Sequence, residues 1–417
     1  MKKGIPSAKQ LVWSDMELGV IIHYLADIYN PDFEDYKTEA VRTELSPDRM
    51  NPTRLDPEQW VRSAYELGAK YAVFVANHCT GFSLWQTKVN DYSCASLKWK
   101  DGKGDVFREF LDACKKYDIK PGVYYSTGCN GYYNINDEWD WDYKSEYYQQ
   151  YVKNVEKQVT ELWSEYGEMF EIWFDGGIVP KEQGGPDILP LLKKYQPGAV
   201  TFQGPVGYPN NLRWVGNEDG YAPENCWGAW NGEGDRREGS PDGEYWEPAE
   251  TDFPNRTHEA HGGGWGWRRD EKRYCLTPEQ LLDCYVNSVG RNTNMLLGMG
   301  ISTEGDFEDE DQFIEFGKLL RKTFSDPLAE IKDAAGDTVT LSCGGKALKY
   351  LVICEDITDG HSILDYSVFA DGKKIYDGKC VGHKRIIPLN GITADEITVK
   401  VNERSGDVKI KDTAVYG

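Results

Sequence analysis

The chain has 417 residues, a formal net charge of −22, and many aromatic residues, including 14 Trp and 26 Tyr. So negative a chain is a poor partner for nucleic acid and for strongly anionic substrates, because both require a basic surface. Neutral ligands are favoured, and sugars suit this composition, since Trp and Tyr rings pack against C–H faces while their polar tips reach hydroxyl groups.

The N-terminal segment has two lysines but no apolar core of a signal peptide, and no apolar run approaches the length of a membrane span. We therefore expect a cytoplasmic protein that does not associate with a membrane. The ten scattered cysteines include no C-x-x-C pair, so we expect them to be reduced and mostly buried. No pattern in the sequence indicates a particular oligomeric state.

The first three quarters of the chain alternate short apolar runs with amphipathic helices, as is typical of a parallel sheet with crossover helices. Asp56-Pro57 and Gly68 predict the two ends of one helix, and Thr277-Pro278 with Gln280 predicts a capping box at the start of another. The expected strands are 19–24, 71–76, 122–125, 169–174, 199–202, 213–215 and 295–297, with one more near 226–230 to complete eight. The pattern predicts an α/β fold, a (β/α)8-like TIM barrel, over residues 1–327.

Residues 228–273 form a stretch rich in Gly and Trp, which we expect to be a long loop with a functional role. Together with Trp227 it contains five tryptophans, and so much apolar surface indicates packing rather than disorder.

From about Asp326 onward, segments alternate polar and apolar residues, and Asp371-Gly372 and Asp377-Gly378 read as turns. This predicts a C-terminal antiparallel β-sandwich over residues 328–417. Tyr366 and Tyr376 are its candidates for exposed, sugar-binding aromatic residues. We expect the domain mainly to pack against the barrel.

Polar side chains follow the expected barrel strands, among them His23, His78, Asp175 and Glu218. All strand C-termini of such a barrel share one face, so these residues are expected to ring one pocket. Two carboxylates in one pocket suit cleavage of a glycosidic bond, which needs a nucleophile or charge stabiliser and a proton donor. The alternative is that Asp175 and Glu218 are structural acids paired with arginines, for which Arg213, Arg236 and Arg237 are the candidates.

A metal-dependent hydrolase is a further alternative, because His23, His78 and the H-x-x-H pair of His258 and His261 are available as ligands. The barrel strands carry no H-x-H pair, and the H-x-x-H pair lies beside three glycines rather than in a helix. We therefore expect no metal and no other cofactor.

Several segments occur together in an order and spacing that resembles glycoside hydrolase family 29, the α-L-fucosidases. They include GVIIHY (19–24), YAVFVANHCTGFSLWQTKVNDYS (71–93), FEIWFDGG (170–177), RWVGNEDG (213–220) and YVNSVGRNTNMLLGMG (285–300). The resemblance extends from about residue 13 to about residue 320. It implies a retaining exo-glycosidase on a (β/α)8-like barrel followed by a β-sandwich, without a metal.

The resemblance also implies roles for individual residues. Asp175, in the WFDG motif, would be the nucleophile, and Glu218, in RWVGNE, would be the acid/base. The latter motif is similar to that of the branch that cleaves α-1,3- and α-1,4-linked fucose from neutral, branched, Lewis-type oligosaccharides. The implied substrate contacts are His23 and His78 on fucose hydroxyls, Tyr125 and Trp173 along the ring, and Arg213 and Trp265 closing the pocket.

The chain departs from the family at Cys79, because most members read K-H-H-D-G-F where this chain has Asn77-His78-Cys79-Thr80-Gly81-Phe82. Tyr24-Leu25 also replaces the usual aromatic or Trp-Gly pair, and the family's Glu-Trp contact has no clear match in residues 26–36. These changes fall in the predicted sugar pocket, so a glycosidase for a related sugar such as α-L-galactose is one alternative. A non-catalytic glycan-binding barrel is another, although a pure binder has no use for both Asp175 and Glu218.

Overall fold

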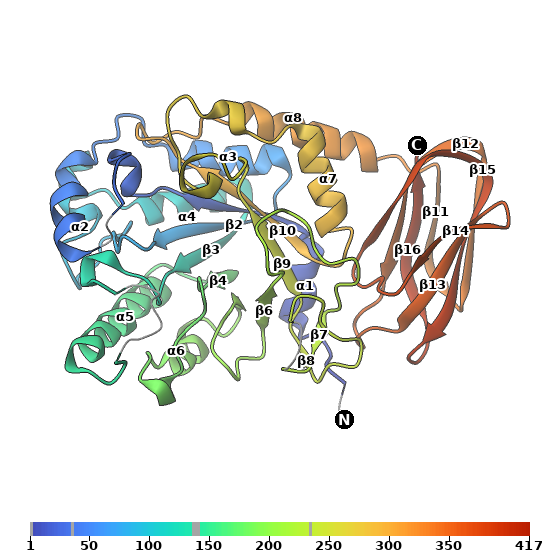
Figure 1. Ribbon diagram of the computed structural model, residues 1–417, viewed down its shortest axis with the longest axis horizontal. Coiled ribbons are helices and arrows are strands. Elements are labelled where there is room, and N and C mark those ends of the chain that lie inside the picture. The colour runs from blue at the N-terminus through green and yellow to red at the C-terminus, as the bar shows by residue number, and fades with distance from the viewer. Residues whose placement is uncertain (1–2, 35–36, 136–141, 233–235) are drawn as a thin grey trace.

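The computed structural model describes residues 3–34, 37–135, 142–232 and 236–417. A barrel formed by the first three quarters of the chain lies beside a C-terminal domain built only of strands (Figure 1). This arrangement confirms the predicted combination of an α/β barrel with an antiparallel β-domain.

Eight parallel strands close the barrel in the order β1-β2-β3-β4-β5-β6-β9-β10, and β10 pairs with β1. They are β1 (Leu18–His23), β2 (Tyr71–Asn77), β3 (Lys120–Tyr125), β4 (Glu171–Trp173), β5 (Val200–Phe202), β6 (Asn211–Trp214), β9 (Ala249–Phe253) and β10 (Asn294–Gly300). Nearly every strand residue is buried, because helices cover the outside while side chains fill the interior.

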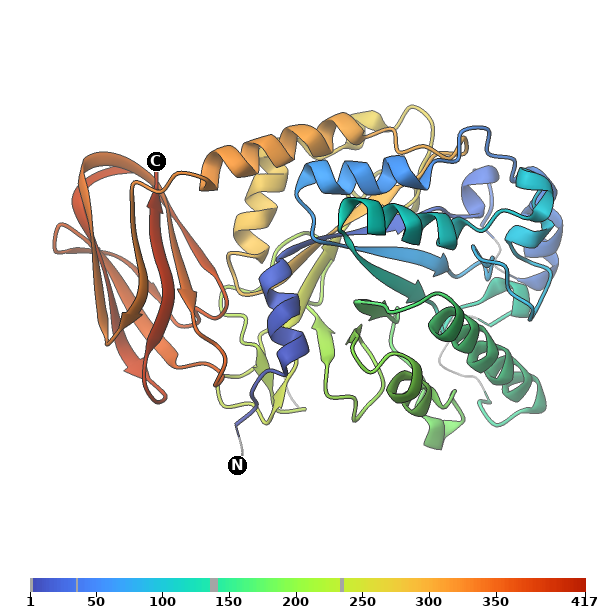
Figure 2. The same cartoon turned by 180° about the vertical axis from the view of Figure 1, so that it is seen from behind.

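The helices are α1 (Ala8–Met16), α2 (Thr38–Glu44), α3 (Pro57–Leu67), α4 (Val106–Tyr117), α5 (Glu146–Glu165), α6 (Ile188–Tyr195), α7 (Pro278–Ser288) and α8 (Glu310–Phe324). The predicted caps are confirmed: Asp56 accepts a hydrogen bond from the backbone of Gln59, and Thr277 and Gln280 form the reciprocal capping box of α7. Helix α1 covers the N-terminal end of the barrel (Figure 2), where the Trp13 indole donates to Glu171 at the start of β4.

The prediction of a barrel strand near residues 226–230 is wrong. In that region β7 (Ala229–Trp230) pairs only with β8 (Tyr245–Trp246), as a separate two-stranded antiparallel sheet. The seventh barrel strand is β9, within the stretch that we expected to be one long loop. Its sequence, AETDF, lacks an apolar run because its polar side chains face other polar groups inside the barrel, where Glu250 accepts hydrogen bonds from Tyr71 and Trp173.

The C-terminal strands form one six-stranded antiparallel sheet in the order β11-β16-β12-β15-β13-β14. They are β11 (Ala329–Ala335), β12 (Thr338–Glu355), β13 (Ile363–Ala370), β14 (Lys373–Gly378), β15 (Arg385–Arg404) and β16 (Lys409–Tyr416). The long strands β12 and β15 contain register shifts, and the sheet curls around an apolar core of its own (Figure 1). The predicted boundary between residues 327 and 328 falls in the segment that joins α8 to β11.

The two tyrosines expected to be exposed on this domain are not exposed. Tyr366 is fully buried in the core of the sheet. Tyr376 is half-buried, and its hydroxyl donates a 2.7 Å hydrogen bond to Glu224 in the barrel domain. Tyr376 therefore helps to join the domains, as the expected packing role of the sheet requires.

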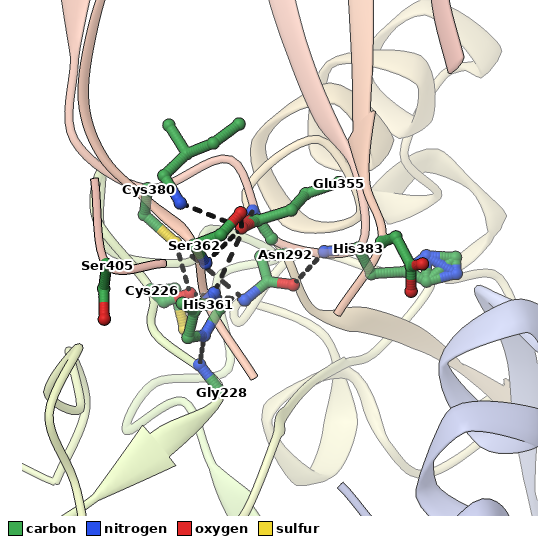
Figure 3. Close-up of polar contacts among 12 residues, drawn as sticks. Cys226, Gly228, Asn292, Glu355, His361, Ser362, Cys380, His383 and Ser405 are labelled. Atoms are coloured by element: carbon green, nitrogen blue, oxygen red, sulfur yellow. Dashed lines mark hydrogen bonds and ion pairs between the residues drawn. The ribbon is translucent and has the colours of Figure 1, made fainter. Parts of the chain in front are cut away.

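Polar contacts hold the sheet domain against the segment that follows Glu218 (Figure 3). His361 is fully buried, its Nε2 accepts a 2.7 Å hydrogen bond from the backbone N–H of Gly228, and its ring lies against Trp227 and Trp246. Nearby, the Cys380 thiol lies 3.3 Å from the carbonyl oxygen of Cys226. The domain interface thus fixes the backbone of residues 226–228.

All ten cysteines lie in the described part of the chain, where they are free thiols; seven are buried, while Cys79, Cys129 and Cys275 are half-buried. No helix within the described residues is both long enough and apolar enough to cross a membrane.

Candidate active site

Aromatic rings form a continuous chain across the C-terminal end of the barrel. Tyr124 stacks on His78 with ring centroids 5.6 Å apart, His78 meets His23 edge-on at 5.9 Å, and His23 lies 5.0 Å from Trp265. These rings come from β3, the turn after β2, the end of β1 and the segment after β9. The barrel thus brings together residues that are up to about 240 positions apart in the sequence, as expected for strand ends that share one face.

Asp175 lies at one end of this chain of rings. It lies two residues after the end of β4 and is exposed, and its Oδ2 accepts a 2.9 Å hydrogen bond from the Tyr124 hydroxyl. Gly176 and Gly177 come next, with φ of +66° and +81°, a backbone conformation that favours glycine. They form a sharp turn directly after Asp175. Thr127 anchors the turn by donating to the Gly177 carbonyl at 3.0 Å.

Glu218 lies at the other end, because its Oε2 accepts a 3.0 Å hydrogen bond from the Trp265 indole. It is exposed on the loop after β6. Asn217 shapes that loop: its side-chain oxygen accepts from the backbone of Asp219, and its amide donates to the carbonyl of Tyr221, both at 3.0 Å. The two candidate catalytic carboxylates are therefore joined by four rings in mutual contact.

Trp265 is held in place by the glycine-rich loop, which includes Gly264 with φ of +96°. A Cβ at Gly264 would approach the Arg256 carbonyl to 2.6 Å, so only glycine fits there. His258 ties this loop to that of Glu218, because its ring nitrogens lie 3.2 Å from the Gly263 carbonyl and 3.2 Å from an Asp219 carboxylate oxygen. Among the described residues, no group of three or more His, Cys, Asp and Glu side chains is placed to hold a metal ion.

The floor beneath the carboxylates is aromatic. Trp173 stacks on Phe202 at 3.9 Å with the rings nearly parallel, and it also stacks on Tyr124 at 5.4 Å. Its indole donates to Glu250 at 2.9 Å, which fixes the ring in the barrel interior. Trp173 is therefore close to the position expected of it, two residues below Asp175 on the same face of β4.

The two histidines differ in charge. Burial and the neighbouring His78 lower the pKa of His23 to about 3, so this imidazole is neutral near pH 7. Burial opposes protonation of His78, but Cys79 and the carboxylates of Asp175 and Asp27 outweigh it and raise the pKa of His78 to about 9. The site therefore offers one neutral imidazole and one cationic imidazolium, which can donate from both nitrogens.

Cys79 lies beside His78, in the turn after β2, and beside Cys129 in the turn after β3. The Cys129 thiol lies 3.9 Å from the Cys79 carbonyl. A hydrogen bond with Cys129, together with burial, raises the pKa of the Cys79 thiol well above its ordinary value. Cys79, Asp175 and Asp27 are the neighbours that favour the His78 imidazolium. Residues 35–36, at the end of the stretch that lacks a Glu-Trp match, lie outside the described residues.

The expectation that Tyr125 lines the sugar ring is wrong. Its hydroxyl donates to Gln158 on α5 at 2.7 Å, so the side chain points out of the barrel. Tyr124 has the opposite orientation and pairs in register with Trp173, which faces inward. Adjacent strand residues alternate between faces, but two consecutive buried tyrosines give no sequence signal for which of them faces the pocket.

The expectation that Arg213 closes the pocket is also wrong, and so is its pairing with a catalytic carboxylate. Its guanidinium is fully buried and donates to backbone carbonyls, at 2.7 Å to Arg236, at 2.6 Å to Trp227, and also to Glu247. Arg213 therefore organises the segment that includes β7 and β8. Arg236 pairs with the Glu247 side chain instead.

Two acidic residues of β9, Glu250 and Asp252, were not predicted as part of the site. Both are buried in the barrel interior beneath Asp175 and Glu218. The signal was the alternation in AETDF, which places both acids on one face, but it was hidden within a stretch that was taken for a loop.

Comparison with known proteins gives one family. The family model described as Alpha-L-fucosidase matches residues 6–322. The chain is 32% identical over 348 residues to Alpha-L-fucosidase 1 of Arabidopsis thaliana, a match that covers 78% of this chain and 62% of the relative. The chain thus matches less than two thirds of the length of that curated relative.

Solved structures agree. A crystal structure described as a "putative alpha-L-fucosidase" from Bacteroides thetaiotaomicron VPI-5482 superimposes with a TM-score of 0.90 at 32% identity and covers 100% of both chains. A glycoside hydrolase 29 family member from an unknown rumen bacterium gives a TM-score of 0.83 at 27% identity, covering 100% of this chain and 77% of its own.

Proposed function

Because the chain belongs to the α-L-fucosidase family, we propose that it is a retaining exo-glycosidase that removes terminal α-L-fucose from oligosaccharides. The observation that carries the proposal is the placement of Asp175 and Glu218 at the two ends of one chain of aromatic rings. Two carboxylates in one pocket are what double displacement requires.

Asp175 is the nucleophile in this proposal. Its carboxylate attacks the anomeric carbon while the bond from that carbon to the leaving oxygen breaks, which gives a covalent glycosyl-enzyme ester. The Tyr124 hydroxyl holds one carboxylate oxygen at 2.9 Å and so orients the other toward the sugar. The aromatic floor under Asp175 shields the forming ester from water.

Glu218 is the general acid and base. In the first step it gives its proton to the leaving oxygen, and in the second it takes a proton from the water that attacks the anomeric carbon and releases Asp175. The Trp265 indole, 3.0 Å from Oε2, fixes the carboxyl group. His258 reinforces this arrangement, since it bridges the two loops that carry Glu218 and Trp265.

Fucose is recognised by the rings between the two carboxylates. Neutral His23 and cationic His78 bind hydroxyl groups, and Trp173 and Trp265 pack against the C–H surface and the C5 methyl group. Galactose-type sugars carry a hydroxymethyl at C5, and an unpaired hydroxyl against an aromatic wall costs roughly 1–3 kcal/mol.

We further propose neutral, branched glycans with α-1,3- or α-1,4-linked fucose, of Lewis type, as the substrates. The support is the likeness of RWVGNE to the motif of that branch and the net charge of −22, which disfavours anionic glycans. Cys79, where most members have a histidine, favours a second candidate, a glycosidase for a related sugar such as α-L-galactose.

A substrate panel tests these proposals. Hydrolysis of Lewis a, Lewis x and 2′-fucosyllactose is compared with that of nitrophenyl α-L-fucoside and nitrophenyl α-L-galactoside. The proposal expects α-L-fucosides to be cleaved, the Lewis glycans faster than 2′-fucosyllactose, and the first sugar product to be the α-anomer by NMR. Preference for the galactoside would favour the second candidate, and the β-anomer would contradict retention.

Two variants test the residue roles. Asp175→Ala is expected to retain less than about a thousandth of the parent activity on every α-fucoside. Glu218→Ala is expected to slow substrates with poor leaving groups far more than nitrophenyl fucoside, because only the former need protonation. Glu396→Ala, which removes an exposed carboxylate on β15 of the sheet domain, is the control. Equal losses of activity on both kinds of substrate in Glu218→Ala would assign the acid to another residue. If the parent itself turned over no glycoside, a non-catalytic glycan-binding barrel would be favoured.

A further inference from the structure

Strand β9 carries two acidic side chains on its inward face, at successive inward positions. Glu250 lies deep in the barrel, where its carboxyl group accepts hydrogen bonds from the Tyr71 hydroxyl at 2.7 Å and the Trp173 indole at 2.9 Å. Asp252 is two residues further along the same strand, and it therefore lies one layer closer to the mouth of the barrel.

Asp252 has none of the partners that Glu250 has. The residue is only 2% exposed, and its Oδ1 is buried without a hydrogen-bond partner among the residues that the structure describes. After burial, the largest charge effects on its pKa come from three acids: Glu250, Glu218 and Asp175. Asp252 is therefore close enough to the two proposed catalytic carboxylates to be affected by their charge.

A buried polar atom without a partner destabilises the folded protein, and a buried ionised carboxylate destabilises it far more. Burial and the three neighbouring acids raise the pKa of Asp252 well above its ordinary value, which favours the neutral carboxylic acid. In this form it carries an O–H that can donate, unlike an ionised carboxylate, which can only accept.

We propose that Asp252 is a substrate-binding residue whose carboxyl group donates a hydrogen bond to a sugar hydroxyl at the floor of the pocket. The proposal rests on the proposed function, since it places the hydroxyl of a glycoside between Asp175 and Glu218. It also explains why an acid occupies this position: the substrate supplies the partner that the free protein lacks, and a second negative charge near the nucleophile is avoided.

The test compares two substitutions that differ only in the donor. Asp252→Asn keeps the shape and an N–H donor and is neutral at every pH, whereas Asp252→Ala removes the donor. Binding of L-fucose, measured by calorimetry, is expected to stay within about threefold of the parent in Asp252→Asn and to weaken at least tenfold in Asp252→Ala. Thr251→Val is the control, because the Thr251 side chain faces the other way and its hydroxyl is hydrogen-bonded to that of Thr293, at 2.8 Å.

Deoxy sugars identify the hydroxyl that Asp252 binds. In the parent, each hydroxyl of L-fucose that is bound should cost affinity when it is removed. For one hydroxyl, its removal should weaken sugar binding to the parent tenfold but should not weaken binding to Asp252→Ala any further. For each of the other hydroxyls, removal should weaken binding equally in the parent and in Asp252→Ala. Additive losses at every hydroxyl would overturn the proposal.

A structural role predicts a different outcome. If Asp252 only stabilises the barrel, Asp252→Asn and Asp252→Ala should lower the thermal midpoint without changing the affinity of the folded protein, and that result would overturn the proposal. The proposed function fails separately: a parent that hydrolyses no α-L-fucoside contradicts it, whereas Asp252→Ala that binds L-fucose like the parent contradicts only the role of Asp252. A parent that does not bind L-fucose contradicts both.

Discussion

Cys79 is the residue at which this site differs most clearly from the family pattern. It lies beside His78 and Cys129. The His78 ring stacks on Tyr124, and the Tyr124 hydroxyl donates to Asp175. A thiol is a weak hydrogen-bond donor, so a sugar hydroxyl placed against it is poorly paired. This position therefore tests whether plain fucose is the natural ligand.

Cys79→His should strengthen binding of L-fucose by about threefold to tenfold if fucose is the natural ligand, because an imidazole is a better donor and acceptor than a thiol. The measurement is the inhibition constant of L-fucose against nitrophenyl fucoside. Cys129→Ser, which changes only the neighbouring thiol, should leave that constant within about twofold. Weaker fucose binding by Cys79→His, with unchanged or tighter binding of L-galactose, would instead indicate a pocket shaped for a related sugar.

His78 gives the site a dependence on alkaline pH. With its pKa at about 9, the imidazolium donates from both nitrogens at neutral pH and loses one donor as the pH rises through about 9. The dissociation constant of L-fucose should therefore increase about tenfold between pH 7.5 and pH 10. His78→Asn should bind more weakly at pH 7.5 but lose this dependence. If the dissociation constant of His78→Asn still increased tenfold at alkaline pH, another group would be the one that titrates.

At the scale of elements, the loop that carries Trp265 connects the proposed sugar pocket to Glu218, the proposed acid/base. The ring of Trp265 lies 5.0 Å from His23, while its N–H holds Glu218. The first contact serves binding and the second serves proton transfer, so a substitution that keeps the ring and removes the N–H separates the two.

Trp265→Phe should lower kcat on Lewis glycans about tenfold and on nitrophenyl fucoside much less, with little change in KM, because Glu218 loses the donor that fixes it. Trp267→Phe is a matched control two residues away: its indole donates to Glu308 at 3.1 Å, outside the site. Steady-state kinetics on both substrates give the answer. Equal losses in the two variants would mean that the loop is merely destabilised.

The elements that the sequence predicted well are those with a strong local signal. Six of the seven expected apolar runs coincide with barrel strands to within about two residues, and 295–297 lies inside the longer strand β10. Asp56, Gly68 and Thr277 mark helix ends as their chemistry requires. Strand β9 was missed because a strand that faces a polar barrel interior has no apolar run. The mistaken expectation for residues 226–230 arose from the need to complete eight strands.

The site was predictable only as far as the strand ends. Asp175, His23 and His78 could be named because each lies at or after the end of a strand and in a family motif, and Trp265 because the resemblance implied it, whereas Tyr124 depended on which face of β3 is inward. Arg213 lies in a family motif, but its guanidinium donates to backbone carbonyls instead of lining the pocket. Only the packing of the folded chain decides between these two orientations. Side-chain direction is a property of the closed barrel rather than of any single segment.

At the scale of the whole molecule, the sheet domain is a support for the active-site loops. His361 receives the N–H of Gly228, and Arg385 donates to the carbonyl of Glu224 at 2.6 Å. Both contacts are on the segment that begins just after Glu218. We therefore expect the position of Glu218, the proposed acid/base, to depend on the interface between the two domains as well as on the barrel.

His361→Leu should destabilise the protein by about 2–3 kcal/mol, because the Gly228 N–H and the nearby Glu355 carboxylate would be buried without this partner. The expected result is a lower thermal midpoint in calorimetry and a smaller, less than tenfold, loss of turnover at 25 °C. His258→Leu, at an exposed histidine, is the control and should leave the midpoint nearly unchanged. An unaltered midpoint in His361→Leu would contradict the supporting role of the interface.

Covalent trapping tests the central claim, that Asp175 attacks the anomeric carbon opposite Glu218, most directly. A 2-deoxy-2-fluoro-L-fucosyl fluoride slows the second step more than the first, so the glycosyl-enzyme ester should accumulate and survive digestion. Mass spectrometry should locate one fluorofucosyl group on the peptide that contains Asp175, and Asp175→Ala should remain unlabelled. A label on any other side chain, or turnover of α-fucosides that yields the β-anomer without a trapped ester, would contradict the account.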